Sequence, residues 1–191
     1  MMALALTAIC GYGQTSGNNV TDDQLRQFAE KSKELIAGLE SGEIAPDTME
    51  AVLQRNIMEV FKPTAEDIAK AQKEAENMKE ITDKDGNVVS LEVDFDSSLE
   101  EKEEQLDGIL DAMSDRMTPR FAKLMKESTT SFDIPLTVDE IVDDSEMTND
   151  EKCAIINMKI VAEGIKANEK QTEKEMEELE QKLYDDGFFT E

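Results

Sequence analysis

The chain has 191 residues and carries 45 Asp and Glu against 20 Lys and Arg, with no histidine, so its formal net charge is −25 at pH 7. This excess of negative charge repels nucleic acid and anionic membrane surfaces. The absence of histidine removes the usual general base at neutral pH, the Ser-His and Cys-His nucleophile pairs and the commonest zinc ligand. The sequence also has neither a Gly-rich phosphate loop nor a nucleophile elbow. We therefore expect no enzyme activity, and carboxylate-based cation binding and protein–protein contact remain.

The N-terminal segment has the pattern of a secretory signal. Met1 to Cys10 is an apolar run that is too short to span a bilayer, and small residues follow before Gln14. The pattern predicts a signal peptide over 1–13, a polar linker over 14–20 and an exported protein, periplasmic or extracellular. No Lys or Arg precedes the run, so a buried N-terminal segment is one alternative. A lipid anchor on Cys10 is another, although Ile9 stands where a lipobox has a small residue.

The next part of the chain, residues 21–79, is predicted to form an N-terminal helical unit. A first helix begins after a Thr21 cap and runs to about Glu40, and Pro46 opens a second. Thr64 caps a third helix that has few apolar residues. Short connections of this kind are typical of a helical bundle.

Residues 80–96 have the alternating pattern of strands and predict an inserted β-hairpin with its turn at Asp85-Gly86. We compared its tip with a calcium-binding EF-hand loop. Asp83, Asp85 and Glu92 match three ligand positions, but Ile81 stands where the first oxygen ligand is required. A plain hairpin is the favoured interpretation, and a metal site at these three carboxylates is the alternative.

Residues 97–191 are predicted to be helical and to form one domain with 21–79. The helix from Leu99 to about Met117 carries a band of carboxylates, each three or four residues from the next: Glu100, Glu104, Asp107, Asp111 and Asp115. Like charges at this spacing destabilise a helix by about 0.2–0.5 kcal/mol per pair. We call these residues the acidic band. A solvated face is the favoured interpretation, and binding of a basic partner surface or of divalent cations is the alternative. Residues 128–136 are predicted to be extended or irregular.

A long helix is predicted from the Thr148-x-x-Glu151 capping box to about Asp186. Its first half is apolar almost all round, as in a central core helix. Cys153 lies in that half, where a buried thiol is more typical than a nucleophile. A seam of residues at steps of three or four continues into the second half: Met158, Val161, Ile165, Asn168, Thr172, Met176, Leu179 and Leu183. We expect this half to fold back on an earlier helix, and pairing with another chain through the seam is the alternative.

Together these patterns predict a mainly α protein, an irregular helical bundle with one inserted β-hairpin and a long C-terminal helix. The predicted function is that of an exported, strongly acidic, non-catalytic protein that acts through protein–protein contact. The partner is a protein, with a basic protein as one candidate and a homo-oligomer formed through the C-terminal helix as another. A calcium-binding module is the alternative, with Ca2+ as its ligand, and an acidic inhibitor of a basic partner protein is the third interpretation.

Overall fold

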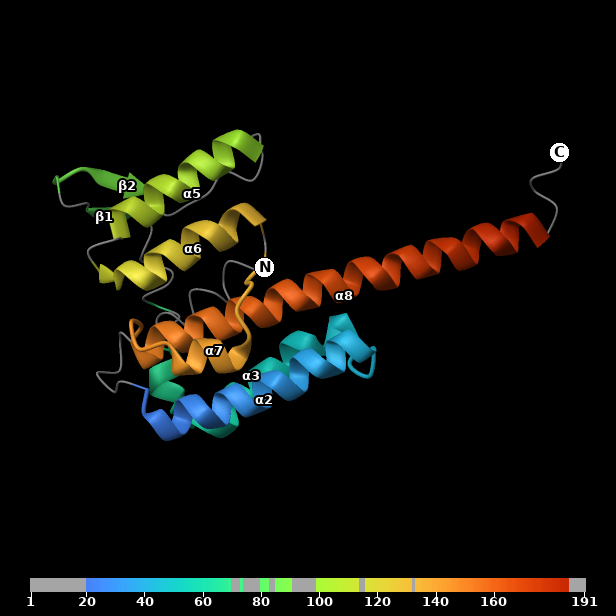
Figure 1. Cartoon of the computed structure of the whole chain (residues 1–191), viewed down its shortest axis with the longest axis horizontal. Coiled ribbons are helices and arrows are strands. Elements are labelled where there is room, and N and C mark those ends of the chain that lie inside the picture. Colours follow the sequence, from blue (N-terminus) through green and yellow to red (C-terminus); the bar gives the residue numbers. More distant parts are fainter. Residues whose placement is uncertain are drawn as a thin grey trace.

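Helices make up most of the computed structural model, which describes residues 20–69, 73, 80–82, 85–90, 99–113, 116–131 and 133–185. In chain order the elements are α2 (Asp22–Ser41), η1 (Pro46–Thr48), α3 (Met49–Phe61), β1 (Glu80–Thr82), β2 (Val88–Ser90), α5 (Leu99–Met113), α6 (Pro119–Ser131), α7 (Val138–Asp143) and α8 (Asn149–Asp185). Residues 65–69 are also helical. The predicted mainly α class and the long C-terminal helix are confirmed (Figure 1).

The helix ends follow local sequence signals. Thr21 caps α2 in a capping box with Gln24, and Thr137 caps α7 with Glu140 in the same way. At the other end of α2, Gly42 adopts the left-handed conformation at φ 76°, which glycine reaches without steric cost. The first helix therefore begins and ends within two residues of the predicted positions.

Two helix ends were predicted wrongly. The helix that starts at Leu99 was expected to reach about Met117, but α5 ends at Met113. The sequence 128–136 is rich in Ser and Thr and was expected to be extended or irregular, but α6 continues to Ser131. Ser128 is buried at the end of this helix, and its hydroxyl donates a hydrogen bond to the carbonyl of Met125 at 3.0 Å. The hydroxyl is satisfied inside the helix, so the weak helix propensity of this segment is overridden by tertiary packing.

Strands β1 and β2 pair antiparallel, with Glu80 opposite Ser90 and Thr82 opposite Val88. Gly86 in the connecting turn has a φ of +86°. Both strands contact α5. The predicted strand residues beyond Ser90, together with Asp83 and Glu92 of the alternative metal site, lie outside the described residues.

The core lies where α2 packs against α8, α3 and α7. The rings of Phe28 and Phe61 meet there with their centroids 5.5 Å apart. The first half of α8 supplies Ile155, Ile156 and Ile160, all with 0% exposure, so the predicted central core helix is confirmed. Helix α6 joins this core from the other side through buried Phe121 and Leu124, which belong to the same apolar cluster.

The elements form layers around α8. Helices α2, α3 and α7 lie on one side of it, whereas α6 lies on the other, with α5 and the two strands beyond α6 (Figure 1). The C-terminal half of α8 extends past all of these elements (Figure 1). The helix is therefore a core element at its start and a projection at its end.

Candidate protein-interaction site

The projecting part of α8 comprises residues 168–185, which we call the distal half. Every one of its side chains is exposed except Leu183, which is half-buried. At 1.5 Å per residue these 18 positions extend over about 27 Å. Within the described residues, no helix combines the length and the apolar run needed to cross a membrane.

The predicted seam runs along α8 from the core into the distal half. Met158, Val161 and Ile165 are half-buried, and Met158 packs against the core. Asn168 and Thr172 are exposed. Further along, Met176 is 58% exposed and Leu179 is 57% exposed. The favoured prediction, in which this half folds back on an earlier helix, is therefore wrong for the described part of the chain, because the distal residues are exposed.

The seam repeats every eleven residues. Val161, Thr172 and Leu183 are spaced by eleven, as are Ile165 and Met176, and Asn168 and Leu179. Eleven residues turn a helix by about three full turns plus 20°, so such a seam stays on one side of a nearly straight helix. The same residues also follow a heptad repeat from Met158 to Thr172, where a second successive step of four interrupts it. The run is therefore shorter than the three or four heptads that indicate a coiled coil from sequence alone. Because the seam stays on one side of the helix, it can contact one partner helix along its length.

Charge is distributed unevenly around the distal half. At about 100° per residue, one flank of the seam carries four carboxylates, which we call the acidic edge: Glu169, Glu173, Glu177 and Glu180. Lys170 and Lys174 lie on the side opposite the seam. Glu175, on the second flank, accepts a hydrogen bond from Gln171 at 2.8 Å.

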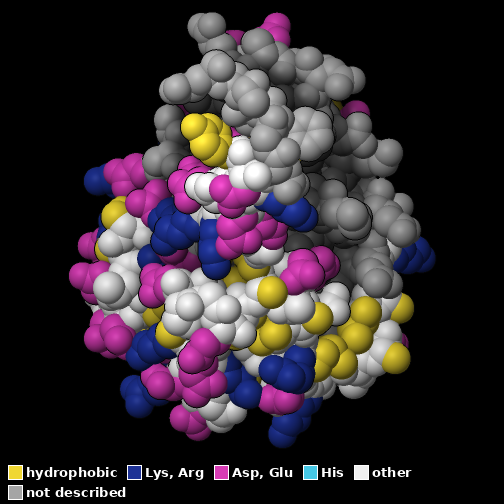
Figure 2. Space-filling view, turned by 90° about the vertical axis from the view of Figure 1, so that its right-hand side faces the viewer, with side chains coloured by type: hydrophobic (Ala, Val, Ile, Leu, Met, Phe, Trp, Pro, Cys, Tyr) yellow, Lys and Arg dark blue, Asp and Glu magenta, His cyan; other side chains and the backbone are white. Residues whose placement is uncertain are grey.

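The four carboxylates of the acidic edge form no ion pair within the described structure. Lys174 lies 3.8 Å from Glu178, away from the edge. Among the residues that the structure describes, none forms an ion pair with the four edge carboxylates. Figure 2 faces the end toward which α8 projects and shows Lys and Arg interspersed with Asp and Glu, with hydrophobic side chains gathered at the lower right.

The described residues of the acidic band on α5 are exposed, and a lysine of α6 reaches two of them. Glu104, Asp107 and Asp111 are exposed on α5, as a solvated face would be. Lys126 of α6 lies 2.8 Å from Asp111 and 3.8 Å from Asp107, and its pKa is raised, first by the hydrogen bond with Asp111. An intramolecular cation thus already faces part of the band. The side chain of Glu100 and all of Asp115 lie outside the described residues.

Neither predicted cation site gains support from the rest of the described chain. Asp85 lies exposed in the turn between the strands. A search of the described ranges finds no group of three or more Cys, Asp or Glu side chains arranged to hold a metal ion. The calcium-binding alternative therefore has no assembled ligand set in this part of the chain.

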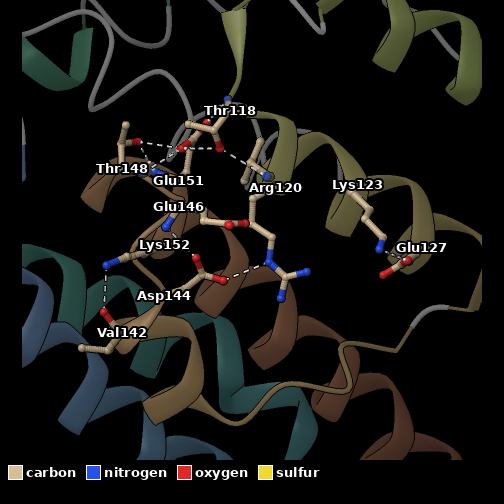
Figure 3. Close-up of polar contacts among 11 residues, drawn as sticks. Thr118, Arg120, Lys123, Glu127, Val142, Asp144, Glu146, Thr148, Glu151 and Lys152 are labelled. Carbon is tan, nitrogen blue, oxygen red and sulfur yellow. Dashed lines mark hydrogen bonds and ion pairs between the residues drawn. The ribbon is translucent and has the colours of Figure 1, made fainter.

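The base of α8 is fixed to α6 by Glu151 (Figure 3). Its carboxylate accepts hydrogen bonds from the backbone N–H of Thr148 at 2.8 Å and from its hydroxyl at 3.0 Å, as a capping box requires. The same carboxylate accepts a bond from the N–H of Thr118 at 2.7 Å and one from the Thr118 hydroxyl at 3.1 Å. One side chain therefore caps α8 and α6 together.

The sequence contained only half of this signal. Thr118 precedes Pro119, a typical start for a helix, and its hydroxyl accepts a bond from the N–H of Phe121 at 3.2 Å. A capping box would place Glu or Gln at position 121, where this chain has Phe. The missing carboxylate comes from Glu151, which is remote in sequence and is found only through the tertiary structure.

Two further contacts connect α7 to α8 and α6. The amino group of Lys152 donates a hydrogen bond to the carbonyl of Val142 at 2.8 Å, and Arg120 donates one from Nε to Asp144 at 2.9 Å (Figure 3). Burial by itself would raise the pKa of Asp144, but hydrogen bonds from Arg120 and from the N–H of Glu146 outweigh it and leave the pKa lowered. These contacts orient the first turns of α8 and hence the projection.

A second set of contacts lies just before the distal half. Lys159 donates a hydrogen bond to the carbonyl of Ile134 at 3.0 Å, and Lys166 donates to Asp133 at 2.7 Å. The hydrogen bond from Lys166 lowers the pKa of Asp133. The segment 133–134 is therefore bound along α8 until about Lys166, after which the helix leaves the body.

Comparison with known proteins gives no match: no family model, no curated protein and no solved structure is similar to this chain at the significance required. The function is therefore inferred from the residues of this chain and their arrangement. Within the described ranges, the distal half of α8 combines exposed apolar residues with carboxylates that form no ion pair.

Proposed function

We propose that this protein is an exported, non-catalytic protein that acts through protein–protein contact, with the distal half of α8 as its contact element. The observation that carries the proposal is the exposed seam. Met176 and Leu179 are each more than half exposed on a helix that otherwise has a strongly charged surface. Export is proposed from the signal-like pattern of residues 1–13.

The energetics favour a partner for this helix. Most helical stability in proteins comes from packing an apolar face, and the distal half has no such packing within the described structure. Burying a large apolar side chain contributes about 1.5–3 kcal/mol. A partner that covers Met176, Leu179 and Leu183 therefore stabilises both the helix and the complex.

The remaining interpretations are weaker. Cation binding by the acidic band is disfavoured because Lys126 already contacts Asp107 and Asp111. The acidic-inhibitor interpretation is a special case of protein–protein contact, in which the partner is an enzyme or toxin with a basic surface. A homo-oligomer formed through α8 is also consistent with the proposal, because a second copy of the chain would then be the partner. The molecular mass of the protein in solution distinguishes this case from a monomer.

Site-specific photo-crosslinking in the producing cell tests the proposal. A benzophenone amino acid replaces Leu179 on the seam or, as a matched control, Gln181 on the opposite side of the same helix. We expect a crosslinked protein adduct from position 179 and none from position 181. Equal crosslinking from both positions, or none from 179 together with a monomeric mass, would contradict a contact role for the seam.

The compartment is tested separately. Edman sequencing of the mature protein from the culture medium or periplasm is expected to show an N-terminus near Gln14. Protein that keeps Met1 and stays in the cytoplasm would contradict export while leaving the contact role of α8 unaffected.

A further inference from the structure

We infer that the partner of the distal half is a basic amphipathic helix, which lies along the seam and places its Lys or Arg side chains against the acidic edge. This inference rests on the proposed function and specifies the chemistry of the partner. It follows from three features of the distal half: the length of the apolar seam, the charge beside it and the poor fit of a second copy.

The length of the seam sets the form of the partner. From Thr172 to Leu183 the seam covers eleven residue steps, which is about 17 Å or three helical turns. Met176 and Leu179 lie between these ends and are its most exposed apolar members. Residues at this spacing are covered well by a second helix that has its own apolar stripe, because side chains of two such stripes interdigitate.

The acidic edge sets the charge of the partner. Glu169, Glu173, Glu177 and Glu180 follow one another at steps of three or four, so each repels the next in the free helix. Lys170 and Lys174 lie opposite the seam and stay outside the interface. A helix with cationic residues beside its apolar stripe relieves this repulsion, and it is attracted from a distance by a chain of net charge −25.

A second copy of the chain complements this surface poorly. In an antiparallel pair each flank faces its own counterpart, so the acidic edge of one copy meets the acidic edge of the other. In a parallel pair the edge faces the second flank, which contains Gln171, Glu175, Glu178 and Lys182 and supplies only one cation. Each copy also brings a net charge of −25, which opposes association.

A designed peptide provides the probe. It is a fluorescein-labelled amphipathic helix with Leu at steps of four, three and four and Lys on both flanks of that stripe. A matched peptide has Glu in place of every Lys. Fluorescence anisotropy measures binding of each peptide to the full chain, and circular dichroism verifies that every protein variant keeps its fold.

Protein variants separate the apolar and the electrostatic contributions. M176Q/L179Q removes apolar surface without changing charge, and E173Q/E177Q/E180Q removes three edge charges without changing the seam. E40Q/E43Q/E50Q is the matched charge control, because it removes three exposed carboxylates from the region of α2 and α3. A chain that ends after Ala167 lacks the distal half but retains the body.

We expect the Lys peptide to bind the full chain and the Glu peptide not to bind. Binding is lost in the shortened chain and falls at least about tenfold in M176Q/L179Q. In E173Q/E177Q/E180Q the affinity for the Lys peptide falls about tenfold and depends less on salt concentration. In E40Q/E43Q/E50Q the affinity changes less than about twofold.

Five results would overturn the inference. Equal binding to the shortened chain, or equal losses in the two triple variants, means non-specific attraction to an acidic protein. Binding that emerges only after deletion of residues 1–19 means that the seam is occupied by the chain's own N-terminal segment. A dimeric mass that is lost on truncation, without peptide binding, identifies a second copy as the partner and leaves the proposed function intact. No peptide binding, a monomeric mass and no crosslink from position 179 would overturn both.

Discussion

The carboxylate of Glu151 completes the helix cap of Thr118, a residue 33 positions earlier in the chain. It accepts the N–H of Thr118 at 2.7 Å while it also accepts the N–H of Thr148 at 2.8 Å in its own capping box. The starts of α6 and α8 are thereby joined through one ionised side chain. Hydrogen bonds to a charged acceptor are stronger than neutral ones, so this contact fixes the base of the projecting helix.

Replacing Glu151 by Ala is expected to lower the free energy of unfolding by about 2 kcal/mol, because two helix caps lose their acceptor at once. Glu140→Ala is the matched control, since Glu140 completes the capping box of α7 with Thr137 but does not bridge to a second helix. Chemical denaturation followed by circular dichroism measures both variants. Equal losses would mean that the bonds to Thr118 contribute nothing to stability.

The pair of Arg120 and Asp144 predicts a specific acid sensitivity. The side chain of Asp144 is 12% exposed, and its pKa lies below the ordinary 3.8 in the folded protein. The carboxylate of Asp144 therefore binds a proton more tightly in the unfolded chain than in the folded protein. Its contribution to the free energy of unfolding is complete above about pH 4 and is lost as the pH falls through the lowered pKa of the folded state. We expect Asp144→Asn to be less stable at pH 6 and to lose less further stability between pH 5 and pH 3. Parallel acid-denaturation curves of the two proteins would contradict this.

Burial of Cys153 predicts an unreactive thiol. Its side chain lies in the core with 3% of the residue exposed, and burial raises its pKa from 9.0 to about 12. The experiment uses a Cys10→Ser variant, so that Cys153 carries the single thiol. Ellman's reagent at pH 8 is expected to modify this thiol in the folded protein only at the rate of unfolding, whereas in denaturant it modifies the thiol at once. Rapid modification of the folded protein would show that the thiol is accessible.

Because the pKa of Cys153 is raised, we also expect the free energy of unfolding to fall at alkaline pH. The folded pKa is raised, so the folded state retains a proton that the unfolded chain releases, and stability is lost as the pH rises from about 9 toward 12. The maximum slope is about 1.4 kcal/mol per pH unit. Cys153→Ala removes this group, and its stability is expected to fall less steeply than that of the parent above pH 9. Identical slopes would exclude the thiol as the cause.

Two helical glycines are expected to respond in opposite directions to replacement by Ala. At Gly38 an added Cβ would lie 2.5 Å from Cδ1 and 2.7 Å from Cγ1 of Ile44, whereas at Gly108 on α5 it meets nothing within 4 Å in the described structure. Gly108→Ala should stabilise by about 0.5–1 kcal/mol through helix propensity, and Gly38→Ala should destabilise because its clash exceeds that gain. Thermal melts measure both changes. If the contact with Ile44 is the cause, the loss at Gly38 shrinks in an Ile44→Ala background.

Local signals in the sequence predicted the helices well, because capping and periodicity are short-range. Thr21 with Gln24 and Thr148 with Glu151 form the capping geometry that their spacing implies. The end of α6 was mispredicted because burial of Ser128 overrides its low helix propensity. The acidic band was identified on its helix, but Lys126 comes from α6, and no spacing within α5 reveals it.

The sequence by itself determined the charge, the absence of histidine chemistry, the helical class and a seam along the last helix, since these depend on composition and on spacing within one helix. Only the tertiary structure decided which part of that seam is buried and which is exposed. Val161 and Leu179 occupy equivalent seam positions, but neighbouring elements pack around the first half of α8 and end before the second. The cap shared by Thr118 and Glu151 is likewise tertiary, because the two residues meet only after α6 packs beside α8. Burial and remote pairing depend on which helices become neighbours, and that information is spread over the whole chain.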